Sequence, residues 1–546
     1  MTLLMENCEK WALIHPKEAR LLPLLEPEAA PTPQRFHFST PQSPVVYVVG
    51  IGTGEPFLAF QDWLNQSPQH LLILLDNDPN ALYHLLSTEI GTAILDHPQV
   101  SLNFVPSPED PGKTLETLYW QTVGSVPEVY NTDKDPDLFD AFRQKILYDS
   151  NVKNALVDEY WQGGVSFFRN FYPNVRKMAE ASNGTALFDQ FKGVPAIICG
   201  AGPSLTKQIP FLKTLADKAV IIAGGSALNA LQAAGVKPHF GAGIDPNSAQ
   251  LERLKETHGA DLPFFYRNRL FAQALDEVKG PRLYIPGCGG YDVADWIDER
   301  LGFSGEFIDE GHNVVNFSLE IASRLGCSPL ILVGVDLAYT DNQHYAQGIP
   351  QTALPFDVLM RTDIHGEPIK TEWKWVAEAE WISDFSQTHT VFNATEGGMP
   401  IPAVTNIPLQ EIKWRKTYPI AEKIQKALLP MPANTSRIVY QSLQELHASL
   451  KKVIPLLDQL GVLDPSSGHF ALAESDLFDE VAYKHILEMF HQVFERVINR
   501  RVLALKLLEG SALAEAKKAL QQQKLAFLKK TAQLNLTILQ WSLGSA

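Results

Sequence analysis

A chain of 546 residues is long enough for about three to four domains. Its hydrophobic content of 45% with 20% charged residues is typical of a globular protein that buries large cores. The formal charge of −16 argues against a nucleic-acid partner or an anionic-membrane surface. Four cysteines lie far apart without metal-ligand spacing, so we expect reduced thiols in a cytoplasmic protein: Cys8, Cys199, Cys288 and Cys327.

The start of the sequence lacks a basic segment followed by an apolar core, so we expect no secretory signal. No apolar run approaches the roughly 20 residues that span a bilayer, so we expect no membrane insertion.

Residues 1–140 are expected to form a Rossmann-like domain. The stretch PVVYVVGIGTGEPF at 44–57 predicts a strand, a GxGxG turn and the start of a helix, and an apolar run at 70–75 ends at Asp76. Strand, glycine turn, helix, strand and terminal acid form a βαβ unit in which the acid suits a ribose hydroxyl. The alternative is a nucleotide fold retained as a scaffold. We favour the scaffold because no second motif follows and short glycine motifs often match by chance.

Residues 141–190 are expected to be a helical connector, and a second α/β domain is expected over 191–410. It opens with an apolar run at 194–199, a Gly-Ala-Gly turn at 200–202 and Pro203 at the first helical position. Such a turn lets ligand atoms approach the backbone and aims N–H groups and the helix dipole at an anion, most often a phosphate. The alternative is an ordinary tight turn of an α/β domain.

Further strands are predicted near 219–224, 240–244, 329–335 and 389–392, and they alternate with helical segments. This alternation predicts a doubly wound parallel sheet with its site at the carboxyl ends of the strands, where Gly202, Asp245 and Asp336 fall. From 411 to 546 the apolar spacing is helical, which predicts a C-terminal helical domain.

Four motifs occur in an order that resembles a known family. They are FKGVPAIICGAGPSL, KPHFGAGIDP, LGCSPLILVGVDLAYTDNQHYAQG and VFNATEGGMPI, between about residues 180 and 405. Their order and spacing are similar to those of the motility accessory factor (Maf) flagellin glycosyltransferases. The central domain of that family is also called 6-hydroxymethylpterin pyrophosphokinase-like, and it is similar to bacterial sialyltransferases that use CMP-activated sugars.

The resemblance implies transfer of a nonulosonic sugar, of the pseudaminic or legionaminic type, from a CMP donor to Ser or Thr hydroxyls of a protein such as flagellin. His344, in the polar loop DNQHY, would be the general base on the acceptor hydroxyl. Tyr339 and Tyr345 would donate hydrogen bonds to the departing phosphate. With those donors in place, the resemblance implies neither a metal nor a cofactor beyond the CMP-sugar itself.

The remaining residues that the resemblance implicates would bind the nucleotide or the sugar. Those of the first glycine turn would hold the phosphate by backbone N–H groups and a hydroxyl. Asp245 and Asn229 would contact sugar or base, and Asp336 would bind ribose or order its loop. The full set is Gly200, Ala201, Gly202, Ser204, Asn229, Asp245, Asn313, Gly334, Asp336, Asn393 and Glu396.

Three departures from the family pattern leave parts of this expectation open. The segment GHNVVN at 311–316 stands where the family has a small Gly-Ser-Val-Ala run, and this difference bears on donor specificity. Tyr339 is one position away from the tyrosine of the similar sialyltransferases. His239 stands where the family usually has an acidic residue. The alternatives are a pterin-type pyrophosphokinase, which needs ATP and Mg²⁺ held by carboxylates, or a non-catalytic nucleotide-binding scaffold.

Overall fold

A computed structural model of the chain describes residues 2–33, 36–108, 115, 118–120, 123–132, 134–256, 261–287, 289–303, 308–311, 313–347, 349, 358–414, 416–505 and 510–544. Cys288 lies outside the described residues; Cys8, Cys199 and Cys327 are buried free thiols. The chain divides into two compact units, Met1–Gly164 with Glu488–Lys529, and Val165–Leu487 with Lys530–Ala546. The predicted C-terminal helical segment contributes residues to both.

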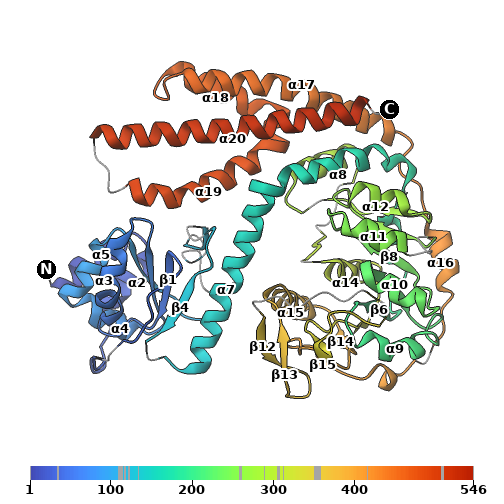
Figure 1. Cartoon of the computed structure of the whole chain (residues 1–546), viewed down its shortest axis with the longest axis horizontal. Coiled ribbons are helices and arrows are strands. Elements are labelled where there is room, and N and C mark those ends of the chain that lie inside the picture. The colour runs from blue at the N-terminus through green and yellow to red at the C-terminus, as the bar shows by residue number, and fades with distance from the viewer. Residues whose placement is uncertain are drawn as a thin grey trace. The chain divides into compact units, whose positions relative to one another are not determined.

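The first unit contains a four-stranded parallel sheet in the order β3-β2-β1-β4 (Figure 1). Its middle strands are completely buried because side chains from both faces enter a core. Val46 and Val48 pack into one core, and Val45, Tyr47 and Val49 into another. The Rossmann-like prediction is therefore confirmed. The elements are α1 (Leu3–Trp11), α2 (Pro16–Leu21), β1 (Val45–Val49), α3 (Glu55–Gln66), β2 (Leu71–Asp76), α4 (Pro79–Leu86), α5 (Glu89–Asp96), β3 (Val100–Phe104), β4 (Glu128–Asn131) and α7 (Pro136–Asp158).

The second unit contains a nine-stranded sheet in the order β15-β14-β11-β6-β7-β8-β9-β10-β5, and all its pairings are parallel. From β6 the chain builds the sheet first through β7 to β10, and then returns to the other side of β6 as β11. The prediction of a doubly wound parallel sheet is confirmed. Its strands are β5 (Ser182–Asn183), β6 (Ala196–Cys199), β7 (Val220–Gly224), β8 (Phe240–Gly243), β9 (Phe264–Tyr266), β10 (Arg282–Tyr284), β11 (Leu330–Val333), β14 (Val391–Asn393) and β15 (Thr405–Asn406).

Helices follow the strands of this sheet in sequence, as parallel crossovers require (Figure 1). The helix α14 (Val314–Arg324) packs across β6, β7, β8 and β11, and Phe317 and Ile321 are fully buried there. A two-stranded antiparallel hairpin, β12 (Leu359–Thr362) with β13 (Pro368–Thr371), precedes α15. The other helices are α8 (Gly164–Arg176), α9 (Leu205–Leu212), α10 (Gly225–Ala233), α11 (Ala249–Glu256), α12 (Ala272–Glu277), α13 (Asp292–Arg300) and α15 (Trp373–Ser386).

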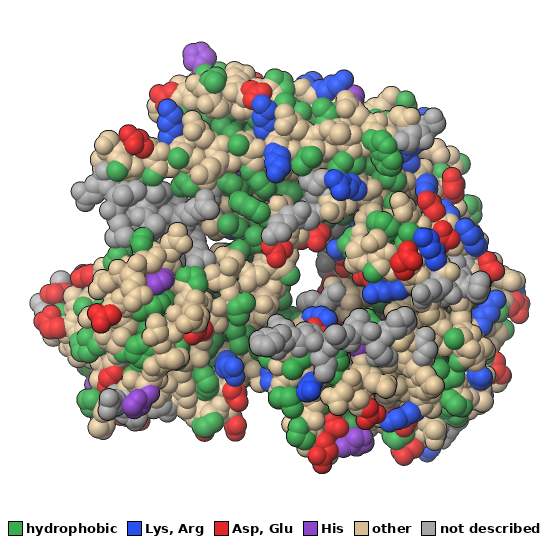
Figure 2. Space-filling model, in the orientation of Figure 1, with side chains coloured by type: hydrophobic (Ala, Val, Ile, Leu, Met, Phe, Trp, Pro, Cys, Tyr) green, Lys and Arg blue, Asp and Glu red, His purple; other side chains and the backbone are tan. Residues whose placement is uncertain are grey.

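The C-terminal part of the chain is helical, as the apolar spacing predicts. It contains α16 (Ile420–Ala427), α17 (Thr435–Val462), α18 (Gly468–Asp479), α19 (Glu488–Leu505) and α20 (Gly510–Gly544). Among the described residues, no helix is long and apolar enough to cross a membrane. Acidic and basic side chains are interspersed over the face that Figure 2 presents.

Candidate functional site

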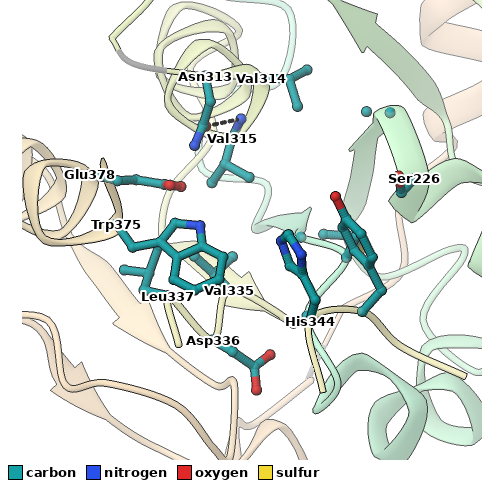
Figure 3. Close-up of a pocket in the computed structure, with 18 of the residues that line it drawn as sticks. Ser226, Asn313, Val314, Val315, Val335, Asp336, Leu337, His344, Trp375 and Glu378 are labelled. Atoms are coloured by element: carbon teal, nitrogen blue, oxygen red, sulfur yellow. Dashed lines mark hydrogen bonds between the residues drawn. The ribbon is translucent and has the colours of Figure 1, made fainter. Parts of the chain in front are cut away.

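A cavity of about 330 Å³ opens at the carboxyl ends of the central strands of the second unit. Its walls come from the loops that follow β6, β7, β8 and β11, together with the N-terminal turns of α14 and α15 (Figure 3). The two loops after β6 and β11 flank the point where the strand order reverses, which is where open α/β sheets bind ligands. The position of the cavity therefore agrees with the site that alternating strands and helices predict.

The glycines of the first turn allow the loops after β6 and β11 to touch. A Cβ on Gly200 would lie 3.0 Å from the carbonyl carbon of Gly334, whose own φ of +68° favours glycine. The N–H of Gly200 donates to the Val333 carbonyl at 2.8 Å, and that of Gly202 donates to the Gly334 carbonyl at 2.8 Å. Both glycines line the cavity, but these two N–H groups bind the neighbouring loop.

Asp336 occupies the N-terminal end of α9. Its carboxylate accepts the Ser204 hydroxyl at 2.7 Å, the Ser204 N–H at 3.3 Å and the Thr340 hydroxyl at 2.7 Å. Burial raises the pKa of Asp336, and the hydrogen bonds from Thr340 and Ser204 oppose that rise. Asp336 lines the cavity, whereas Ser204 is fully buried behind it and directs both of its donors to Asp336. This geometry corresponds to loop ordering, one of the two roles expected for Asp336.

The N-terminus of α10 is the second helix end at the cavity. Its N-cap residue, Gly224, has no capping side chain, and Gly224, Gly225 and Ser226 all line the cavity. Arg253 lies alongside, with its Cδ 3.7 Å from where a Cβ of Gly225 would stand, and it pairs with Asp245 at 2.8 Å. An uncapped helix N-terminus beside a guanidinium favours an anionic group. Sequence analysis found Asp245 but missed Arg253, eight positions further along.

His344 lies among aromatic rings at the same cavity. Its imidazole stacks on Tyr345 with centroids 3.9 Å apart, and it meets the edges of Trp375 at 5.2 Å and Tyr339 at 5.5 Å. Burial lowers the pKa of His344, and the positive charges of Lys374 and Arg253 lower it further, against an opposing effect of Glu372. The imidazole is therefore neutral at neutral pH, which a general base requires.

Tyr339 supports this arrangement from behind the cavity wall. Its hydroxyl donates to Glu372, and its ring lies 4.9 Å from that of Trp375. It is buried and does not line the cavity, whereas Tyr345 does. The structure thus places the hydroxyl of Tyr339 on a carboxylate of the protein, outside the lining of the cavity.

The N-terminus of α14, by contrast, is capped. The Asn313 Oδ1 accepts the N–H group of Val315 at 2.8 Å (Figure 3) and that of Asn316 at 3.3 Å. The side chain also hydrogen-bonds Glu378. Burial raises the pKa of Glu378 to about 7, against the opposing effects of Asn313 and Lys374. Both Asn313 and Glu378 line the cavity.

Sequence analysis missed the contribution of α15, which brings Lys374, Trp375 and Glu378 to the cavity. The signal for it was the segment WKWVAEAE, in which these three residues share one side of a helix. The same spacing is typical of an amphipathic packing helix, so the sequence alone does not distinguish the two.

Besides Ser204, three predicted donor-binding residues lie outside the lining of this cavity. Asn229 is on α10 beyond its first turn. Asn393 is buried at the end of β14, where it bonds the Asn406 side chain at 2.9 Å and accepts the Thr395 N–H at 3.1 Å. Glu396 adopts a left-handed φ of 57° in the following loop. For Asn393, these contacts correspond to turn formation.

The N-terminal GxGxG turn directs its polar groups into the protein. The Glu55 carboxylate accepts the N–H and the hydroxyl of Thr53, each at 2.7 Å, at the start of α3. Asp76, the acid that would contact a ribose, accepts the Ile51 N–H at 2.9 Å and pairs with Lys134 at 2.6 Å. These contacts support the scaffold interpretation of this unit.

Among the residues that the structure describes, no group of three or more His, Cys, Asp or Glu side chains is arranged to hold a metal ion.

Comparisons with known proteins agree with this fold. Residues 169–342 match the 6-hydroxymethylpterin diphosphokinase MptE-like family. That match includes the Gly200 turn, Asp245 and Asp336 and ends before His344. No curated protein matches the sequence. A solved structure of a Maf glycosyltransferase from Magnetospirillum magneticum AMB-1 is similar over 99% of this chain and 96% of that one, with a TM-score of 0.56 and 15% identity.

The class of protein that follows is an α/β chain of two compact units, in which the second has a doubly wound sheet and residues 169–342 are similar to the MptE-like family. More particularly, the chain has the fold of a Maf glycosyltransferase over nearly its whole length.

Proposed function

We propose that this protein is a glycosyltransferase that moves a nonulosonic sugar from a CMP-activated donor to a Ser or Thr hydroxyl of a protein such as flagellin. The observation that carries the proposal is His344, a half-buried, neutral imidazole at a cavity on the strand-order reversal of a Maf-like fold. The reduced, buried cysteines fit an intracellular, cytoplasmic enzyme.

In the proposed reaction, the acceptor hydroxyl oxygen bonds to the anomeric carbon of the sugar while the bond from that carbon to the phosphate oxygen breaks. The electron pair of the broken bond leaves with CMP, and the acceptor proton passes to the imidazole of His344. A neutral imidazole accepts this proton at working pH, and a positioned base contributes about 10²–10⁴-fold in rate. Trp375 and Tyr345 hold the ring by contact.

The donor's phosphate would lie at the N-terminus of α10, beside Arg253. The support for this position is the absence of a capping side chain on Gly224, together with the guanidinium next to Gly225. At the N-termini of α9 and α14, Asp336 and Asn313 already occupy N–H groups. The loop at residues 200–202 would then serve as a close wall for the nucleotide. No metal or further cofactor enters this proposal.

A pterin-type pyrophosphokinase is the alternative that the family description raises. It would need carboxylates that bridge Mg²⁺ and the phosphates of ATP. The candidates at the cavity are engaged elsewhere, since Asp245 pairs with Arg253 and Asp336 binds Ser204. Metal binding would have to break those contacts, so we prefer the transferase.

Ligand titration tests the proposal. Thermal shift and calorimetry with CMP, CTP, S-adenosylmethionine, and ATP with and without Mg²⁺ are expected to single out the cytidine nucleotides, because a ligand that binds only the folded state raises its melting temperature. Arg253→Gln is expected to weaken CMP binding about 10- to 100-fold, as loss of a charge-assisted hydrogen bond predicts.

Arg300→Gln is the matched control, because Arg300 also pairs with a carboxylate at 2.8 Å at similar exposure but lies outside the cavity. It should bind CMP like the unaltered protein. Selective binding of ATP with Mg²⁺, or equal effects of the two substitutions, would contradict the proposal.

A further inference from the structure

One buried acid of the cavity has no part in the reaction as written above. Glu378 lies in the second turn of α15, is only 3% exposed and still lines the cavity. Figure 3 shows its carboxyl group near Asn313 and Trp375, with Ser226 on the far side. A side chain that is almost completely buried yet borders the ligand space is placed to contact what binds there.

The contacts of Glu378 define what it can offer a ligand. Asn313 uses its Oδ1 to cap α14, so its amide NH₂ is the group that donates to Glu378. The nearby Lys374 pairs with Glu372 at 2.8 Å. One amide donor satisfies only part of a carboxyl group, which leaves the group an oxygen for a further hydrogen bond.

Burial favours the neutral form of Glu378, whereas the positive charge of Lys374 opposes that form. On its own helix, Lys374 is the nearby cation, and Glu372 balances it. On α14, which packs against α15, Glu320 is paired with Arg324 at 3.0 Å. The other ionisable residues that line the cavity are Cys199, Asp245, Arg253, Asp336, His344 and Tyr345. Since burial penalises an ionised carboxylate, Glu378 carries a proton below its pKa of about 7.

We propose that Glu378 is a specificity residue that donates a hydrogen bond, as a carboxylic acid, to the carboxylate of the transferred sugar acid. This inference rests on the proposed function. A CMP-nonulosonate carries two anionic groups, and the phosphate has its own anchor at α10 and Arg253. The sugar carboxylate is thus the anion that remains for the end of the cavity that Glu378 lines. A neutral acid binds such an anion, whereas an ionised Glu378 would repel it.

The inference predicts a pH dependence that CMP alone does not share. The pKa of Glu378 is raised to about 7, so its donor proton is present below that pH and lost above it. From pH 6 to pH 8, the affinity of the unaltered protein for a CMP-sugar acid should therefore fall about 10-fold relative to that of a Glu378→Gln variant. This comparison leaves out the second ionisation of the phosphate of free CMP, which lies at about pH 6. CMP lacks the sugar carboxylate, so Glu378 should add no pH dependence to its binding.

Calorimetry with CMP and with a cleavage-resistant CMP–3-fluoro-N-acetylneuraminic acid at pH 6, 7 and 8 tests this. Glu378→Gln keeps an N–H donor, so at pH 6 it should keep the advantage of the sugar nucleotide, and it should lose the pH dependence that Glu378 adds to sugar-nucleotide binding. Glu378→Ala should lose the advantage about 10-fold at pH 6 and leave CMP affinity unchanged. Unaltered CMP affinity also shows that each variant is folded.

Glu320→Gln is the matched control, since Glu320 is another buried acid with its pKa raised to about 7 but lies outside the cavity lining. It should behave like the unaltered protein. If CMP fails to bind the unaltered protein, the proposed function itself falls, and this inference with it. If CMP binds but the sugar nucleotide has no advantage, or if the advantage persists unchanged in Glu378→Ala, only the role of Glu378 is overturned.

Discussion

Replacing Gly202 by alanine should destabilise the second unit by acting on Asp336. A Cβ at this position would stand 2.7 Å from the Asp336 Cγ, and ordinary contact begins at 3.4 Å. The carboxyl group must therefore move, and its 2.7 Å hydrogen bonds to the Ser204 and Thr340 hydroxyls lengthen beyond the normal range. Hydrogen bonds to charged groups contribute about 1.5–3 kcal/mol each, so we expect a loss of about 3 kcal/mol or more.

Gly397→Ala is the matched comparison, because it adds a Cβ beside the same carboxylate at a tolerable distance. That Cβ would lie 3.3 Å from the Asp336 Oδ2, so we expect a change within about 1 kcal/mol. Urea unfolding gives the free energies, and hydrogen exchange of peptides over residues 196–212 and 330–346 tests where the protection is lost. Equal stability of the Gly202 and Gly397 variants, or unchanged exchange in those peptides, would refute the reasoning.

The contact between Gly202 and Asp336 also affects what loss of CMP binding in a Gly202 variant would mean. The family resemblance suggests that a larger side chain at this turn blocks nucleotide approach while leaving the fold intact. The contact with Asp336 instead couples the turn to the loop after β11. Loss of CMP binding in a Gly202 variant would therefore not by itself identify a phosphate site.

Two further predictions concern the base and the N-terminal unit. His344→Ala should lower donor turnover about 10²–10⁴-fold with little change in CMP affinity. In the unaltered enzyme, the loss of activity on the acid side of the pH profile should lie below pH 6.5, because a base with a lowered pKa loses activity only when it is protonated. Near-normal turnover of the variant, or loss of its CMP binding, would contradict this role. Asp76→Asn breaks the buried pair with Lys134 and should destabilise the first unit by about 3–5 kcal/mol in urea unfolding. S-adenosylmethionine should not raise the melting temperature of the unaltered protein, and a clear shift that this substitution removes would instead identify a nucleoside site.

The sequence by itself determined the fold class of both sheets. Apolar runs such as those of β1, β6 and β11 are each followed by a glycine and carry no alternation, which is the pattern of strands buried on both faces of a parallel sheet. The order of strands and helices then places Gly200, Asp245 and Asp336 at one edge, because parallel strands share the edge at which they end. The location of the cavity was predictable for that reason.

Only the tertiary structure decided how the polar groups at that edge are used. Ser204 and Asp336 are 132 positions apart, yet the Ser204 hydroxyl donates a hydrogen bond to the Asp336 carboxylate. Asn313 caps α14 while it also binds Glu378 on α15. Buried donors and acceptors must find partners wherever the fold supplies them, so hydrogen bonding is settled in three dimensions and local sequence does not reveal it. For the same reason, the turn at residues 200–202, which is typical of phosphate binding, directs N–H groups to the loop after β11. Arg253, which the sequence does not single out, lies at the N-terminus of α10, where no side chain caps the helix.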